Sequence, residues 1–160
     1  MNFRHFLSIV LFLGFSVFLQ SQNIDTYWQQ AVQYEMNINF DVETNRFTGK
    51  QKLTYINHSP DTLKKVYYHL YFNAFQPNSM MDARSRTIVD PDPRVGSRIQ
   101  NLSEDEIGYH RIDRLTQNGK KVKYEVVGTI LEVELNEPIF PNSTAIFEMD
   151  FNSQVPLQVR

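Results

Sequence analysis

The segment of residues 32–41 constrains the fold of this chain more than any other part of its sequence. Its residues alternate between apolar and polar types without a break. The apolar positions are Val32, Tyr34, Met36, Ile38 and Phe40, and the polar positions are Gln33, Glu35, Asn37, Asn39 and Asp41. A period of two places successive side chains on opposite faces of an extended strand. The segment therefore predicts a strand with one buried and one solvated face.

Further segments show the same strand signals. A polar turn at residues 43–45 leads to a second run at 46–57, which should pair with the first as a hairpin. The other predicted strands cover residues 63–72, 109–115, 121–127, 129–135 and 145–152. The dipeptide Asn118-Gly119 favours a two-residue hairpin. Short strands separated by turns predict an all-β fold, an antiparallel β-sandwich or open barrel.

The N-terminus has the plan of a secretory signal peptide. Arg4 precedes a charge-free apolar run at residues 6–19, and the small residue Ser21 follows it. The run is about 14 residues long, whereas a membrane-spanning helix needs about 20. We expect a signal peptide at residues 1–21 and an exported protein, periplasmic or secreted, with no stable membrane anchor after cleavage. A buried helix or a retained anchor is the alternative interpretation.

Composition limits what the remaining chain, residues 22–160, can be. The full chain has 41% apolar and 13% aromatic residues, so the part after the signal peptide can bury a core of one domain. The formal net charge of −2, with acids and bases interspersed, excludes a strong field for nucleic acid or an anionic membrane. Because the chain has no cysteine, disulfides, thiolate metal sites and a cysteine nucleophile are excluded.

Residues 73–98 interrupt the strand pattern with scattered prolines, methionines and arginines. We interpret them as a long connection, and a loop of this length is a candidate for contact with a neighbouring domain. Ser103 and Glu106 have the spacing of a capping box, which predicts a helix start or a single helical turn.

The histidines do not form a recognisable metal motif. None of His5, His58, His69 and His110 has the second histidine and the glutamate of an H-E-x-x-H zinc helix. His69 stands among tyrosines on a predicted strand, where a packed or interface role is the simpler interpretation.

Two clusters of charged residues can each be interpreted either as a binding site or as an ordinary surface feature. Asp90, Asp92 and Asp105 could ligate calcium, but they lack the glycine and terminal glutamate of a calcium loop, so a surface turn is favoured. The arginines of the long connection could clamp an anion, although a salt-bridged interdomain surface is favoured. These arginines are Arg84, Arg86, Arg94 and Arg98. The sequons at Asn57, Asn101 and Asn142 matter only in a host that glycosylates exported proteins.

A series of short motifs in residues 34–74 resembles the opening of a known family. The first strand ends in Phe40-Asp41, and a turn leads to Phe47-Thr48-Gly49. The second strand ends in Asn57-His58-Ser59, and an aromatic-rich third strand follows at residues 66–72. This order is similar to the N-terminal domain of the aminopeptidase N family of zinc metallopeptidases, which includes leukotriene hydrolase. The resemblance covers most of residues 33–155.

The resemblance implies a saddle-like antiparallel β-sandwich that covers one side of a thermolysin-like catalytic domain. Zinc, its ligands, the catalytic glutamate and the exopeptidase loop then lie downstream, so no catalytic, cofactor-binding or metal-binding residue is assigned in this chain. The expected partners are the downstream peptidase domain of the same polypeptide and, in the parent, a peptide substrate, with zinc as the parent's cofactor. Nucleic acid is not an expected partner.

Two interpretations of the role follow. In the first, the chain is a signal peptide and an N-terminal domain truncated at its C-terminal end, inactive alone, from an exported zinc aminopeptidase. In the second, it is a stand-alone exported sandwich that binds a peptide, a sugar or a cell-surface partner through tyrosines at residues 67–71.

Overall fold

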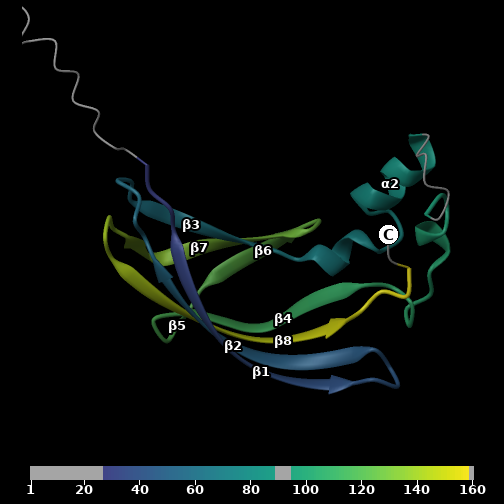
Figure 1. Cartoon of the computed structure of the whole chain (residues 1–160), viewed down its shortest axis with the longest axis horizontal. Helices are drawn as coiled ribbons and strands as arrows, with labels where there is room; N and C mark the ends of the chain where they lie inside the picture. Colours follow the sequence, from purple (N-terminus) through teal and green to yellow (C-terminus); the bar gives the residue numbers. More distant parts are fainter. Residues whose placement is uncertain (1–26, 89–94, 159–160) are drawn as a thin grey trace, which may run out of the picture.

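Two antiparallel sheets organise the computed structural model, which describes residues 27–88 and 95–158 (Figure 1). The larger sheet has five strands in the order β1-β2-β8-β4-β5, and the smaller has three in the order β3-β7-β6. The five strands are β1 (Ala31–Asp41), β2 (Arg46–Ile56), β8 (Thr144–Gln154), β4 (Tyr109–Gln117) and β5 (Lys120–Lys121). The three are β3 (Leu63–His69), β7 (Ile130–Ile139) and β6 (Lys123–Val127). The predicted all-β antiparallel class is confirmed.

The core lies where the inner rows of the two sheets meet. Phe147 of β8 and Leu115 of β4 are fully buried, as are Leu131 and Val133 of β7. Tyr68 of β3 packs edge-on against Phe147, with ring centroids 6.5 Å apart. Burying side chains of this size stabilises the fold by about 1.5–3 kcal/mol each. The sandwich is therefore held mainly by β8 and β4 on one side and β3 and β7 on the other.

Strand β1 differs from the sequence prediction in its burial. Its alternation is confirmed by an unbroken pairing with β2 from Ala31 to Asp41. Its apolar row nevertheless remains 48–51% exposed, from Val32 to Phe40. The expectation of one buried face was wrong because the three-stranded sheet is narrower than the five-stranded one and does not cover this edge (Figure 1).

The turns of the large sheet follow the predicted chemistry. Asp41 closes the β1–β2 turn, accepting hydrogen bonds from the Glu43 amide (3.0 Å) and the Thr44 hydroxyl (2.7 Å). These bonds, that from Thr44 first, lower the pKa of Asp41 below its usual 3.8. The β4–β5 hairpin turns through Asn118 and Gly119, whose φ angles of 49° and 79° suit a primed turn.

Asn57 fastens the end of β2 to the β7–β8 turn. Its fully buried side chain donates to the carbonyl oxygens of Ile139 (3.1 Å) and Phe140 (3.2 Å) and accepts from the amide and hydroxyl of Ser59. The Asn-x-Ser motif is thus a buried structural network. Asn57 is inaccessible as a sequon in this fold, whereas Asn101 and Asn142 are exposed.

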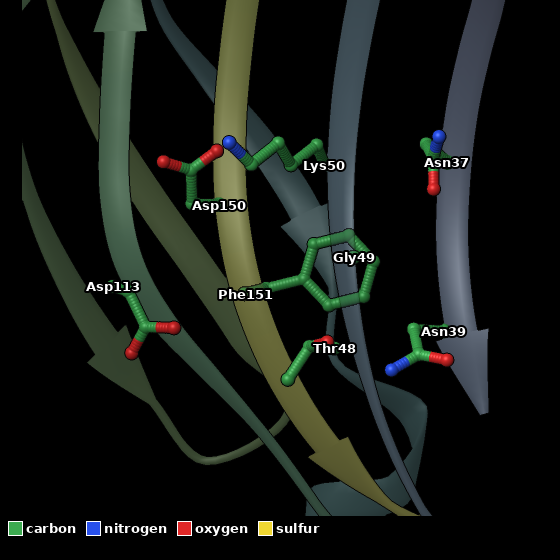
Figure 2. Close-up of a pocket in the computed structure, with 8 residues that line it drawn as sticks. All are labelled: Asn37, Asn39, Thr48, Gly49, Lys50, Asp113, Asp150 and Phe151. Atoms are coloured by element: carbon green, nitrogen blue, oxygen red, sulfur yellow. The ribbon is translucent and has the colours of Figure 1, made fainter. Parts of the chain in front are cut away.

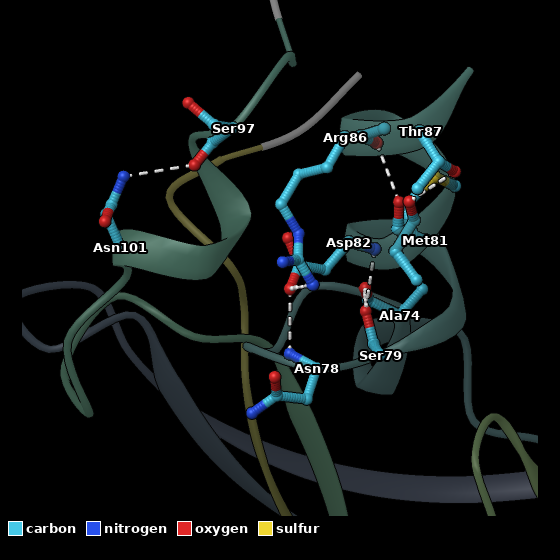
Figure 3. Close-up of polar contacts among 11 residues, drawn as sticks. Ala74, Asn78, Ser79, Met81, Asp82, Arg86, Thr87, Ser97 and Asn101 are labelled. Carbon is cyan, nitrogen blue, oxygen red and sulfur yellow. Dashed lines mark hydrogen bonds and ion pairs between the residues drawn. The ribbon is translucent and has the colours of Figure 1, made fainter.

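Residues 71–101 contain helical structure that the sequence prediction of a long connection missed. They form η1 (Tyr71–Ala74), α2 (Met80–Thr87) and η2 (Ile99–Asn101). The Ser79 hydroxyl caps α2 by accepting from the Asp82 amide at 3.1 Å (Figure 3). Asp82, fully buried, accepts from Arg86 at 3.1 Å one turn later. Polar capping, rather than an apolar stripe, defines this helix.

Three predicted boundaries were also wrong. The strand predicted at residues 63–72 ends at His69, where η1 follows. The strand predicted at 121–127 is split at Val122, which is buried between β5 and β6. The strand predicted at 129–135 continues to Ile139. At residues 103–106 a single turn forms, as predicted. The Ser103 amide and hydroxyl both donate to the Glu106 carboxylate at 2.9 Å, and the Glu106 amide donates to the Ser103 carbonyl oxygen.

Some sequence predictions lie outside the described residues. They are the signal peptide at 1–21 and the residues Asp90, Asp92 and Arg94. Within the described ranges, no helix is both long and apolar enough to cross a membrane.

Gly49 has a steric role at the centre of the large sheet. It lies opposite Phe151 in the β2–β8 pair, and a Cβ added there would come within 2.7 Å of Cε1 of the Phe151 ring. The ring therefore occupies the space that a side chain at position 49 would need.

We predict that Gly49→Ala destabilises the fold by about 1–3 kcal/mol, because the ring must leave its place. Urea unfolding measures the change. The matched control is Thr48→Ala on the exposed outer face of the same strand, which should cost less than about 0.5 kcal/mol. Equal losses in the two variants would show that the Gly49–Phe151 contact has no special role.

Candidate functional site

An apolar groove of about 220 Å³ lies on the concave side of the large sheet, beside β3. Its floor comes from β1, β2 and β8, which contribute Met36, Ile38, Phe47, Gln51, Met149 and Phe151. Its walls come from the end of β3 and from β4, through Tyr68, His69, Leu70, His110 and Ile112. The alternation of the strands places all the floor residues on one face. We treat this surface, called the concave groove below, as the candidate functional site.

Phe47 is the centre of an aromatic cluster at one end of the groove. Its ring stacks on Phe40 at 5.8 Å and meets Phe151 and Phe72 edge-on at 6.2 and 6.3 Å. Such pairs prefer these geometries and add to the stabilisation from area alone. Three phenylalanine rings therefore pack against Phe47 at this end of the groove.

Two residues that line the concave groove each have a buried polar atom without a hydrogen-bond partner among the described residues. These atoms are Nε2 of Gln51, a residue only 9% exposed, and the hydroxyl of Tyr68. Burial raises the pKa of Tyr68 well above its usual 10, with a smaller contribution from Tyr34, so its hydroxyl stays protonated. Buried groups of this kind normally have a partner. The groove lining is thus mostly apolar, with two buried donors that have no partner among the described residues.

His110 forms part of the groove wall and is held in one orientation. Its Nδ1 lies 2.7 Å from the Ser153 hydroxyl, and its ring stacks on Phe72 with centroids 4.5 Å apart. Burial lowers the pKa of His110 below its usual 6.5, since the charged form would lose hydration. The side chain therefore contributes a neutral, mostly apolar surface.

The convex face of the same sheet is polar. An open hollow of about 560 Å³ is lined by Asn37, Asn39, Thr48, Lys50, Asp113 and Asp150 (Figure 2). Asp113 accepts from Asn152 at 2.8 Å, and Asp150 lies 3.7 Å from Arg114. Charges of both signs that pair with one another indicate a solvated surface rather than a site for a charged ligand.

The charged clusters noted in the sequence do not converge on a site in the described residues. Arg86 pairs with Asp82 inside α2, and Asp105 pairs with Arg46 at 2.8 Å. His69 is exposed and stacks on Tyr71 at 5.1 Å, as an interface histidine could. No group of three or more metal-ligating side chains occurs within residues 27–88 and 95–158.

The sequence prediction missed the groove itself. Alternation places Gln51 on the same inner face of β2 as Phe47, Leu53 and Tyr55. A polar residue at an inner position was the available signal. Its meaning depends on which strands the second sheet covers, and the alternation does not contain that information.

Comparison with known proteins places this geometry in a fold family. No family model and no curated protein matches the sequence. A two-domain M1 zinc metallopeptidase mutant bound to L-arginine superposes on 82% of this chain with a TM-score of 0.51 and 15% identity. This chain has the fold of one part of an M1 zinc metallopeptidase. The resemblance to the aminopeptidase N family is confirmed at the level of the fold.

The M1 match covers only part of the solved protein. The chain spans 22% of the two-domain structure. A second match, the M1 zinc metallopeptidase from Deinococcus radiodurans, has a TM-score of 0.49 at 15% identity and covers 78% of this chain and 20% of that one. The described chain therefore spans about a fifth of the length of these M1 structures.

The depressed pKa of His110 generates a pH test of the groove wall. Because the pKa of His110 is lower in the folded state than in the unfolded state, only the unfolded state binds a proton as the pH falls below 6.5. The free energy of unfolding is therefore highest above pH 6.5 and falls as the pH drops from 6.5 toward the folded pKa. We predict that the chain loses stability between pH 7.5 and 5.5 and that His110→Asn loses less over the same interval. Urea unfolding at both pH values measures the difference. An unchanged pH dependence in the variant would contradict the assignment.

Proposed function

We propose that this chain is the non-catalytic N-terminal β-domain of an exported zinc-dependent aminopeptidase. In this proposal it packs against a downstream peptidase domain and helps to enclose the active-site cleft. The open concave groove carries the proposal, because a surface with the composition of a core stays in contact with water. The fold match, which extends over about a fifth of an M1 zinc metallopeptidase, supports the assignment of the missing partner.

Zinc does not fit the residues of this domain. The described part of the chain contains no cluster of three histidine or carboxylate side chains that could hold the ion. The proposal therefore places zinc, the catalytic residues and the peptide substrate in the downstream domain. This domain contributes a wall and a docking surface, and no step of the chemistry involves its residues.

We also propose that the protein is exported, to the periplasm or to the medium. Export is supported by the sequence pattern of residues 1–21.

We predict that the purified chain, loaded with zinc, releases no N-terminal amino acids from peptides. The product of the reading frame continued beyond codon 160 should do so in a zinc-dependent manner. Release of amino acids by the isolated chain would contradict the non-catalytic role. A continued reading frame that encodes no H-E-x-x-H motif would contradict the proposal of a downstream zinc peptidase domain.

Docking through the concave groove can be tested with this domain and the proposed downstream peptidase domain, each produced separately. Ile38→Lys places a charge on the groove floor and should weaken docking at least about tenfold, because burying an unpaired charge costs more than about 1.4 kcal/mol. Association of the separately produced domains, measured by calorimetry, reports the change. The matched control is Asn37→Lys, on the opposite face of the same strand, which should leave docking unchanged. If both variants dock like the wild type, the groove is not the docking surface.

A second candidate function is a stand-alone exported module that binds a peptide, sugar or cell-surface partner. The observation in its favour is that Tyr67 and Tyr71 are 59% and 68% exposed, whereas Tyr68 between them is largely buried. A stop codon directly after codon 160 would favour this function.

A further inference from the structure

Among the described residues, no strand pairs with the outer edge of β1. Strand β1 pairs with β2 on one side and lies at the end of the strand order, along the lower margin of the large sheet in Figure 1. Its pairing with β2 has no register shift across all eleven residues. A long edge strand without a bulge and with exposed apolar side chains is a template for pairing with another strand.

The other edges of the described sheets carry features that discourage pairing. Strand β5 has two residues and pairs only with Thr116 and Gln117, so the rest of β4 is an edge as well, with a register shift between Ile112 and Arg114. Strand β6 has five residues and begins with Lys123. Strand β3 contains Lys64 and Lys65 and a register shift between Leu63 and Lys65. Short length, lysines and bulges are the usual protections of an edge. Strand β1 has no lysine, no proline and no bulge, so it is the unprotected edge among the described strands.

The sequence of β1 is complementary to itself. When two copies of β1 pair antiparallel, their apolar rows lie on the same face of the joined sheet only if even-numbered residues lie opposite even-numbered residues. The register that uses the whole of Ala31–Asp41 then has its two-fold axis at Met36. It places Val32 opposite Phe40 and Tyr34 opposite Ile38. Both are pairs of an aromatic and a β-branched side chain, which stabilise neighbouring strands.

The charges of β1 agree with the same register. Glu35 lies opposite Asn37 of the other copy, and Asp41 lies opposite Ala31, so no two like charges face each other directly. Glu35 also accepts a salt bridge from Lys52 of its own β2 at 3.2 Å, which reduces the diagonal repulsion between the two Glu35 side chains.

We propose that β1 is a homodimerisation edge, at which a second copy of this chain pairs antiparallel about Met36 and joins the two five-stranded sheets. The pairing uses backbone groups and leaves both concave grooves open on one continuous face. It does not rest on the proposed peptidase function, since it follows from the edge of this chain alone.

A disulfide tests the register directly, because the chain has no cysteine of its own. Residues directly opposite each other in an antiparallel pair have Cα atoms about 4.5–5.5 Å apart, within disulfide range. Met36→Cys in residues 22–160, which contain every described strand, should form an intermolecular disulfide at least about tenfold faster than Ile38→Cys. In the proposed dimer two copies of residue 38 are roughly 14 Å apart. Both positions are about equally exposed, at 50% and 49%, so they are matched.

Sedimentation equilibrium of the wild-type chain supplies the second readout and should show a monomer–dimer equilibrium. Asn37→Lys places two opposite-charge pairs with Glu35 across the dimer and should strengthen it at least about threefold, whereas Asn37→Glu should weaken it by a similar factor. Asn37 lies opposite Lys50 of its own chain in both the monomer and the dimer. The interaction between these two residues therefore does not change the dimerisation constant. Thermal unfolding confirms that each variant is folded.

The proposal is overturned by equal disulfide rates at positions 36 and 38, or by a chain that stays monomeric at all concentrations. If the chain is monomeric, a strand from another polypeptide would be the alternative partner for the edge of β1.

Discussion

The structure depends on the burial of the inner row of β8 between the two sheets. Phe147 is fully enclosed, Ala145 is 2% exposed, and both belong to one buried cluster with Val66, Leu131 and Val133 of the smaller sheet. Because β8 lies in the middle of the large sheet, this contact fixes where the smaller sheet sits. Three strands cannot cover five, so the apolar row of β1 is left about half exposed, while Gln51 and Leu53 on the inner face of β2 are buried. The concave groove and the free edge are both consequences of this mismatch in width.

The motifs that indicate the M1 fold act on structure and not on chemistry. Asp41 closes a turn, Gly49 makes room for the Phe151 ring, and Asn57 joins the end of β2 to the β7–β8 turn. Each satisfies a steric or hydrogen-bonding requirement that few other residues could meet. This explains why a chain at 15% identity retains the fold of an M1 structure while the described residues lack a zinc-binding cluster.

The strands were predictable from sequence because alternation is local. The pairing of β1 with β2, the Asn118-Gly119 hairpin and the turn at Ser103 all follow from residues close together in the chain. Helix α2 was not predictable by periodicity, since its only buried residue is Asp82 and it has no apolar row. Its signal was Ser79 three residues before Asp82, an N-cap spacing. The groove depends on the relative widths of two sheets, a property of the assembled fold that no single segment encodes.

The structure of the complete protein encoded by the continued reading frame tests the central claim most directly. The account predicts that residues from outside this domain fill the concave groove, cover Met36 and Ile38, and offer an acceptor to Nε2 of Gln51. A complete protein in which this groove faces solvent, with Gln51 still unpaired, would contradict the account.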